Sequence, residues 1–167
     1  MFFNSFENPA IKTVEVINKL KELPHTFHLT GSHFTNSATK ESDWDFFVNA
    51  ASLNIGKDIL AIPGFERNER EYIDDRSIVV VYSWNNGDKK VDIQLIDPDL
   101  MAWKVLANNE LAPIMYEIDK EFERTQEYLP VNLRIQKRDD VKRLKRKIWD
   151  TSLEAYRFGR RPGKSAV

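Results

Sequence analysis

Two aspartates separated by one residue stand at the start of an apolar segment, where their carboxylates could bind a cation. They are Asp43 and Asp45, in the stretch Ser42-Asp43-Trp44-Asp45-Phe46-Phe47-Val48. Side chains at positions i and i+2 of a strand point to the same face, so these two carboxylates would lie close together. Like charges at such a distance repel each other. A divalent cation that prefers oxygen ligands, such as Mg²⁺, would relieve the repulsion.

A third carboxylate interrupts a later apolar segment, Val91-Asp92-Ile93-Gln94-Leu95. Because the odd-numbered positions are apolar, Asp92 lies on the opposite face of the expected strand, where burial without a partner is costly. If this strand neighbours the strand of Asp43 and Asp45, three carboxylates converge. Taken singly, the Asp-x-Asp pair also suits a surface turn or a helix cap, and Asp92 also suits a solvent-exposed sheet face.

The elements that would position these carboxylates can be read from hydrophobic periodicity and turn residues. We expect helices over residues 8–23 and 57–62, and strands over residues 26–30, 44–48, 77–84 and 90–96. Gly31-Ser32 breaks the first strand, and Asn85-Asn86-Gly87-Asp88 is a hairpin turn between the last two strands. Residues 66–75 are interpreted as a connector, because they mix acidic and basic side chains.

The rest of the chain is expected to be helical. Asp97-Pro98-Asp99 is typical of a helix start, and helices are predicted to about Leu106, over residues 113–128 and over residues 139–158. The last of these has a candidate buried stripe and a basic outer face. The stripe is Val141, Leu144, Ile148, Leu153 and Tyr156, and the face is Lys142, Arg143, Lys145, Arg146 and Lys147.

The order of these elements predicts an α/β (α+β) fold, with a small mixed β-sheet of about four to five strands flanked by helices. Residues 1–110 would form the core, and residues 111–167 a basic helical extension packed on it. The 167 residues are 41% hydrophobic and 31% charged, which is typical of a globular protein. No apolar run has the length of a membrane span, so we expect a cytoplasmic protein without a membrane partner.

The chain contains no cysteine, which excludes disulfides and thiolate metal sites. His25, His28 and His33 lack zinc-ligand spacing and are interpreted as structural or exposed, although His33 adjoins Ser32. Net charge is −1 but unevenly distributed, with +8 over residues 134–167 and −9 over residues 1–133. The basic segment is either a contact for a polyanion such as a nucleic acid or a solvated helix face.

In combination, the carboxylates and the Gly-Ser turn resemble a known signature. Gly31-Ser32, ten intervening residues, Asp43-Trp44-Asp45 and the later Val91-Asp92-Ile93 are similar to the motifs of the nucleotidyltransferase superfamily, which has a polymerase-beta-like fold. The resemblance covers about residues 26 to 97. Two departures are present: many members carry an arginine soon after the Gly-Ser, whereas Lys40 is the only Lys or Arg in residues 33–40, and Trp44 replaces a small aliphatic residue.

The resemblance implies roles for each matching residue. Gly31 and Ser32 would hold the phosphates of a nucleoside triphosphate, while Asp43, Asp45 and Asp92 would bind two Mg²⁺ ions. Asp92 would also help to deprotonate the acceptor. The implied activity is transfer of a nucleoside monophosphate from the NTP to a hydroxyl acceptor, for which an RNA 3′ end, a protein hydroxyl and a small molecule are all open.

Two other functions remain open on the sequence. The first is a catalytically inactive module of the same fold that binds nucleic acid or a partner protein. The second is a generic α/β protein in which the aspartates are incidental. Convergence of Asp43, Asp45 and Asp92 within one site would argue against the second.

Overall fold

The computed structural model describes residues 12–71 and 78–159, and the chain divides into two compact units. The first unit comprises residues 1–34 and 38–101, and the second comprises residues 35–37 and 102–167. Among the described residues, no helix combines the length and the apolar character that crossing a membrane requires.

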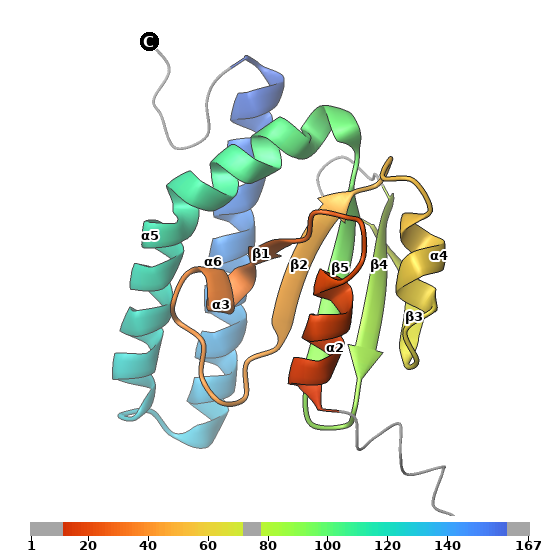
Figure 1. Ribbon diagram of the computed structural model, residues 1–167. Helices are drawn as coiled ribbons and strands as arrows, with labels where there is room; N and C mark the ends of the chain where they lie inside the picture. Colours follow the sequence, from red (N-terminus) through yellow and green to blue (C-terminus); the bar gives the residue numbers. More distant parts are fainter. Residues whose placement is uncertain (1–11, 72–77, 160–167) are drawn as a thin grey trace, which may run out of the picture. The chain divides into compact units, whose positions relative to one another are not determined.

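The first unit contains a mixed five-stranded sheet (Figure 1). Its strands are β1 (His28–Thr30), β2 (Trp44–Asn49), β3 (Phe65–Glu71), β4 (Ile78–Asn85) and β5 (Lys90–Ile96), in the order β1-β2-β5-β4-β3. Strands β2 and β5 are parallel, and every other neighbouring pair is antiparallel. The predicted α/β class with a small mixed sheet flanked by helices is therefore confirmed.

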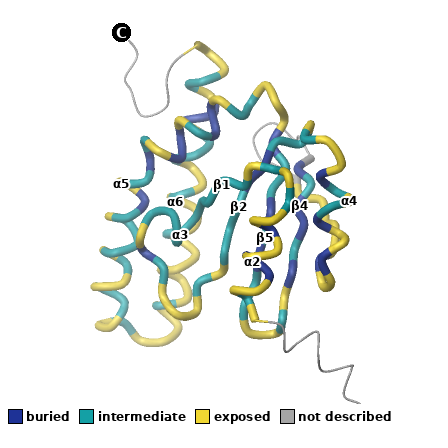
Figure 2. The backbone as a smooth tube through the Cα atoms, viewed as in Figure 1, coloured by how far each residue is buried: buried dark blue, intermediate teal, exposed yellow. Residues whose placement is uncertain are grey.

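One face of this sheet is the apolar core of the first unit, packed against α2 (Thr13–Lys21) and α4 (Ile55–Leu60). Burial is concentrated along β4 and β5 (Figure 2). Residues of alternating position supply the core from each strand, as the pleat requires. They are Val48, Phe65, Tyr82, Trp84, Val91 and Ile93, with Val16, Leu20, Ile55 and Ile59 from the helices. Each such side chain contributes about 1.5–3 kcal/mol through burial, which holds the strands in one register.

The opposite face of the sheet carries a row of polar side chains. Paired residues of neighbouring strands project to the same face, and the pairing runs from β3 to β1 without a shift. The row is Glu66, Ser83, Asp92, Asp45 and Thr30. The fold therefore places the two strand aspartates side by side, on the face away from the apolar core.

The second unit is built on α5 (Met101–Gln126) and α6 (Val131–Arg157). The Trp103 indole N–H donates to Ser152 Oγ at 3.2 Å, and the Trp103 and Trp149 rings meet edge to face. Asp119 accepts hydrogen bonds from Lys145 Nζ at 2.8 Å and from Ser37 Oγ at 2.7 Å. These contacts join the two helices and attach the short segment 35–37 to them.

A single helix replaces the two that were expected on either side of residue 113. After the 3₁₀ turn Pro98–Leu100, α5 continues through Pro113 to Gln126. A proline inside a helix removes one backbone hydrogen bond and costs about 3 kcal/mol. The buried side chains of α5 nevertheless continue at intervals of four residues on both sides of it, at Trp103, Ala107, Leu111 and Met115. This continuous apolar stripe outweighs the local cost.

The expected connector over residues 66–75 was also wrong for the part that is described, because β3 occupies Phe65–Glu71. This strand pairs with β4 alone, at the edge of the sheet, and residues 66–70 are exposed. Charged edge strands are common in proteins because they discourage pairing with other chains. Residues 72–75 of the expected connector lie outside the described residues.

Two helices differ from their predicted bounds and faces. The expected helix over residues 139–158 is longer and begins at Val131, and Leu144 of its predicted buried stripe is 48% exposed. Leu153 of that stripe is buried. Helix α2 covers only Thr13–Lys21 of the expected residues 8–23, whose first four residues lie outside the described part of the chain.

Candidate functional site

Strands β2 and β5 lie side by side in the sheet (Figure 1). Asp45 and Asp92 are direct partners in this parallel pair. Neighbouring strands lie about 4.8 Å apart, and paired residues share a face, so the two carboxylates are neighbours. The register is set by the apolar positions on either side, since Trp44 pairs with Val91 and Phe46 with Ile93. A slip by one residue would bury both aspartates in the core, which their charge forbids.

Asp45 has a carboxyl group that is hard to ionise. Its pKa is raised from 3.8 to about 6, first by burial and then by the negative charges of Asp92 and Asp43. Arg70 and Lys90 oppose this shift more weakly. Desolvation and like charges both favour the protonated acid. Near neutral pH the site therefore contains an excess of negative charge that a cation would relieve.

Asp92 is held on both of its oxygens. Ser83 Oγ donates to Asp92 Oδ1 at 2.6 Å, and Arg70 Nη2 lies 3.4 Å from Asp92 Oδ2. Ser83 pairs with Asp92 across the β4–β5 hairpin, whereas Arg70 reaches it from the edge strand β3. The side chain of Asp92 is 14% exposed, compared with 54% for that of Arg70. The carboxylate is therefore oriented by one hydroxyl and balanced by one exposed cation.

Asp43 lies just before β2 and is exposed, so it is not a strand residue as the i and i+2 interpretation expected. Its Oδ1 accepts a hydrogen bond from the backbone N–H of Lys90 at 3.1 Å. This bond attaches the start of β2 to the start of β5. Because the charge of Asp43 acts on Asp45, all three predicted carboxylates belong to one electrostatic cluster.

Gly31 follows β1 and begins α3 (Gly31–Phe34), where its φ of +69° favours glycine. A Cβ atom at this position would lie 2.6 Å from Asp45 Oδ2. The chain therefore uses glycine here to let the backbone approach the carboxylate. Because α3 is a single turn, its dipole is small, and any phosphate contact would depend on individual backbone N–H groups.

His33 lies against the segment that carries Asp43 and Asp45. Its ring stacks on Trp44, with 3.6 Å between centroids and 8° between planes, and its Nε2 donates to the Ser42 carbonyl at 3.5 Å. Burial is the main cause that lowers the pKa of His33. A neutral imidazole on Trp44 covers the segment that leads into β2. Lys40, the only cation in residues 33–40, is exposed.

The carboxylates match Mg²⁺ in kind, although their arrangement does not form a complete protein cage. Within residues 12–71 and 78–159, no group of three or more His, Cys, Asp or Glu side chains is placed to hold a metal ion. Mg²⁺ is usually bound by one or two carboxylates together with substrate phosphates and water. Asp45 and the adjacent Asp92 therefore supply the number of carboxylates that such a site usually takes from a protein.

Two residues that contact Asp92 were missed by the sequence interpretation. Ser83 is the polar residue in the apolar run Val79-Val80-Val81-Tyr82-Ser83-Trp84, and the hairpin turn places it opposite Asp92. A two-residue turn at Asn86-Gly87 would have paired Ser83 with Lys90, so the register could not have been counted from it; the observed turn is longer and pairs Asn85 with Lys90. Arg70 had no comparable signal, because β3 is polar at every position from 66 to 70 and shows no alternation.

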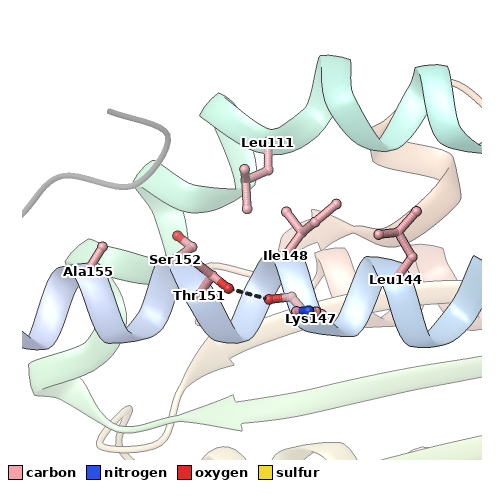
Figure 3. Close-up of a pocket in the computed structure, with 7 residues that line it drawn as sticks. All are labelled: Leu111, Leu144, Lys147, Ile148, Thr151, Ser152 and Ala155. Carbon is pink, nitrogen blue, oxygen red and sulfur yellow. Dashed lines mark hydrogen bonds between the residues drawn. The ribbon is translucent and has the colours of Figure 1, made fainter. Parts of the chain in front are cut away.

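A largely apolar pocket of about 500 Å³ lies between α5 and α6 of the second unit (Figure 3). Leu111, Leu144 and Ile148 supply its apolar wall. Thr151, which also lines the pocket, uses its hydroxyl to donate to the Lys147 carbonyl at 2.8 Å. Among the described residues, those that line this pocket include neither a carboxylate nor a histidine.

Comparison with known proteins gives a weak likeness at the level of structure. No family model matches the chain, and no curated protein matches it. A structure of Cid1 with the UTP analogue UMPNPP is 16% identical, with a TM-score of 0.37, over 76% of this chain and 41% of that chain. The Cid1 poly(U) polymerase crystal structure is 18% identical, with a TM-score of 0.37, over 74% and 42%.

A structure of a cytoplasmic RNA terminal U-transferase is 15% identical, also with a TM-score of 0.37, and the match covers 76% of this chain and 42% of that chain. The chain thus spans about two fifths of the length of the solved chains that it resembles. At this level of similarity the likeness carries no conclusion about the activity of the chain.

Proposed function

We propose that the chain is a Mg²⁺-dependent nucleotidyltransferase that moves a nucleoside monophosphate from an NTP to a hydroxyl acceptor. The observation that carries this proposal is the pairing of Asp45 with Asp92, together with the pKa of Asp45 near 6. A half-buried pair of carboxylates at one sheet face is costly for the fold unless a cation and its ligands share the site.

Each residue of the site would have its own role in this reaction. Asp45 and Asp92, with Asp43 at the rim, would hold Mg²⁺ that arrives with the triphosphate, and the two-ion arrangement remains a prediction. Bound Mg²⁺ would supply charge stabilisation for in-line displacement at the α-phosphate. Gly31 and Ser32 would offer backbone N–H groups to the phosphates. Ser83 would keep Asp92 oriented, since it donates to Asp92 Oδ1.

The basic part of the chain gives weaker support for a nucleic-acid acceptor such as an RNA 3′ end. Lys142, Arg143, Arg146 and Lys147 are exposed on α6, whereas Lys145 is paired with Asp119. Cations on an exposed helix can neutralise phosphates, with an affinity that falls as salt rises. Three further statements remain predictions: contact of a nucleic acid with α6, packing of residues 111–167 on the core, and a cytoplasmic location.

The direct test is release of pyrophosphate from each NTP in the presence of Mg²⁺ and a pool of RNA acceptors. Asp45→Asn and Asp92→Asn should each lower the rate by at least about a hundredfold, because each removes a charge from the reacting centre. Asp88→Asn is the matched control, since Asp88 is an exposed aspartate in the β4–β5 turn. Equal rates for all three variants would rule out the assignment.

A second candidate function is a catalytically inactive module that binds nucleic acid or a partner protein. It is favoured by the contacts of Asp92, whose oxygens are already engaged by Ser83 and Arg70. This function predicts RNA binding that needs no Mg²⁺ and no release of pyrophosphate with any NTP. The Asp45→Asn variant would then bind RNA as tightly as the unchanged chain.

A further inference from the structure

A polar cavity of about 370 Å³ opens along β3, β4 and β5, beside Asp92. Its lining includes Glu66, Asn68 and Arg70 from β3, Ser83 and Asn85 from β4, and Lys90 from β5. Two of these lining residues, Ser83 and Arg70, contact the Asp92 carboxylate directly. The cavity therefore adjoins the carboxylate cluster on its β3 side, and β1 with Gly31 lies on the other side of β2.

The charges that line this cavity balance one another. Arg70 and Lys90 are cations, Glu66 and Glu69 are anions, and Arg70 is also shared with Asp92. A groove that tracks a polyphosphate backbone needs an excess of cations. The balanced lining instead suits a neutral group that both donates and accepts hydrogen bonds.

Amide and carboxylate groups of the cavity can bind hydroxyls in both directions. The side-chain oxygen Oδ1 of Asn85 accepts from the Gly87 N–H at 2.7 Å, and the NH₂ group of the same side chain can donate. The Asn68 amide can donate and accept, and the Glu66 carboxylate accepts from two adjacent hydroxyls. A volume of about 370 Å³ lies at the small end of ligand sites, where one sugar ring fits.

On the basis of the proposed function, we propose that this cavity binds the sugar of the acceptor through its vicinal diol. The diol would lie against Glu66 and Asn68, with one hydroxyl at Asp92. That hydroxyl oxygen forms a bond to the α-phosphorus of the NTP, and the bond between the α-phosphorus and the bridging oxygen breaks. Pyrophosphate leaves with the electron pair, and the hydroxyl proton passes to Asp92.

Binding can be tested on the full chain by the NMR signals of the Asn68 and Asn85 side-chain amides, without any turnover. The probes are oligoadenylate with a 3′-terminal diol, the same strand ending in a 2′,3′-dideoxy sugar, and free adenosine. We expect the diol strand to shift both amide signals and the dideoxy strand to leave them in place. If the cavity recognises the sugar alone, free adenosine should also shift the two amide signals. If it recognises the 3′ end of an RNA, only the diol strand should shift them.

Kinetics give the second measurement. Asn68→Ala and Glu66→Gln should each raise the KM for the diol acceptor by about fivefold to thirtyfold, which corresponds to the loss of one or two hydrogen bonds. The KM for the NTP should not change. Asn109→Ala, at an exposed asparagine of α5, is the matched control. Both cavity variants lie on the exposed edge strand β3, where truncation should leave the fold intact.

The inference fails if diol and dideoxy strands shift the amides equally, or if neither shifts them. It also fails if Asn68→Ala and Glu66→Gln leave the acceptor KM unchanged while Asp45→Asn abolishes pyrophosphate release. That second result would overturn the cavity alone and support the proposed function. A different result would contradict the proposed function: the unchanged chain would release no pyrophosphate, even though the diol strand shifted the amide signals.

Discussion

The backbone at Gly31 lies so close to Asp45 that a Cβ atom there would be 2.6 Å from Asp45 Oδ2. The same atom would lie 3.2 Å from Asp45 Cβ. Two features therefore require glycine at position 31: the positive φ and the close approach of the Asp45 side chain. The turn after β1 and the aspartate of β2 are therefore one structural unit, although a loop separates them in the sequence.

Gly31→Ala should destabilise the protein more than Gly87→Ala does. Both glycines have positive φ, but a Cβ atom at Gly87 would meet nothing within 4 Å. Gly87→Ala should therefore cost about 1 kcal/mol from backbone strain, and Gly31→Ala about 2–4 kcal/mol. Denaturant unfolding measures both. In an Asp45→Ala background the cost of Gly31→Ala should shrink, and an unchanged cost would show that Asp45 is not the obstacle.

Asp45→Asn should stabilise the metal-free protein near neutral pH. The native state holds the Asp45 proton with a pKa of about 6, above its ordinary value of 3.8, so the native state binds more protons than the unfolded state between these values. Stability of the unchanged chain should fall as pH rises through this window, by up to about 3 kcal/mol, and then level off.

The measurement is the free energy of unfolding from about pH 3 to pH 8 for the unchanged chain and for Asp45→Asn. The two curves should meet below about pH 4 and separate above it, with the variant more stable. Asp88→Asn, in the exposed turn, should run parallel to the unchanged chain. A variant that is less stable than the unchanged chain at neutral pH would contradict the raised pKa.

Mg²⁺ with a nonhydrolysable NTP analogue should raise the melting temperature, and this gain should disappear in acid. Ligand at a hundred times its Kd stabilises the native state by about 2.7 kcal/mol. Because Asp45 must lose its proton to bind a cation, the gain should weaken as pH falls through about 6. Asp45→Asn and Asp92→Asn should lack it at every pH. A gain that persists in either variant would place the ion elsewhere.

His25 should prove structural even though it forms a Ser-His-Asp constellation. Its Nδ1 lies 2.5 Å from Ser52 Oγ, and its Nε2 lies 2.7 Å from Asp58 Oδ2. The His25 side chain is only 1% exposed, so it cannot deliver a proton to a substrate in solvent. His25→Ala should cost about 2–4 kcal/mol, and Ser52→Ala about 1 kcal/mol.

Serine-reactive fluorophosphonate provides the complementary measurement. We expect no labelling of Ser52 and an unchanged rate of pyrophosphate release in Ser52→Ala, measured well below the melting temperature. Labelling that is lost in both Ser52→Ala and His25→Ala would instead reveal a nucleophile.

Most strands of the sheet could be predicted from the sequence because they are short runs rich in β-branched and aromatic residues. Strand β5 was expected at residues 90–96 and is observed at Lys90–Ile96, and its buried residues Val91 and Ile93 define the core face. Strand β3 could not be predicted because neither of its faces is apolar over residues 66–70. Its strand conformation depends on pairing with β4, which is a tertiary contact. Helix α5 was divided wrongly at Pro113, because one lost hydrogen bond weighs less than a long buried stripe.

The candidate site was predictable in its carboxylates and unpredictable in their partners. Asp45 and Asp92 could be placed on one face because β-strand periodicity fixes which side chains share it. Contacts such as Arg70 with Asp92 depend on which strand takes the edge position, and local sequence does not encode that order. The close approach of Gly31 to Asp45 was likewise hidden, since it is visible only in three dimensions.

The parallel pairing of β2 with β5 also has a consequence for the order of folding. The antiparallel neighbours β3, β4 and β5 follow one another in the chain and can pair through short loop closures, whereas β5 joins β2 only after α4, β3 and β4 have been passed. Contacts between distant parts of a chain form slowly because their loop entropy is lost first. Asp45 and Asp92 should therefore meet late, once the apolar partners around them are in place, so that their mutual repulsion opposes only the last step of folding.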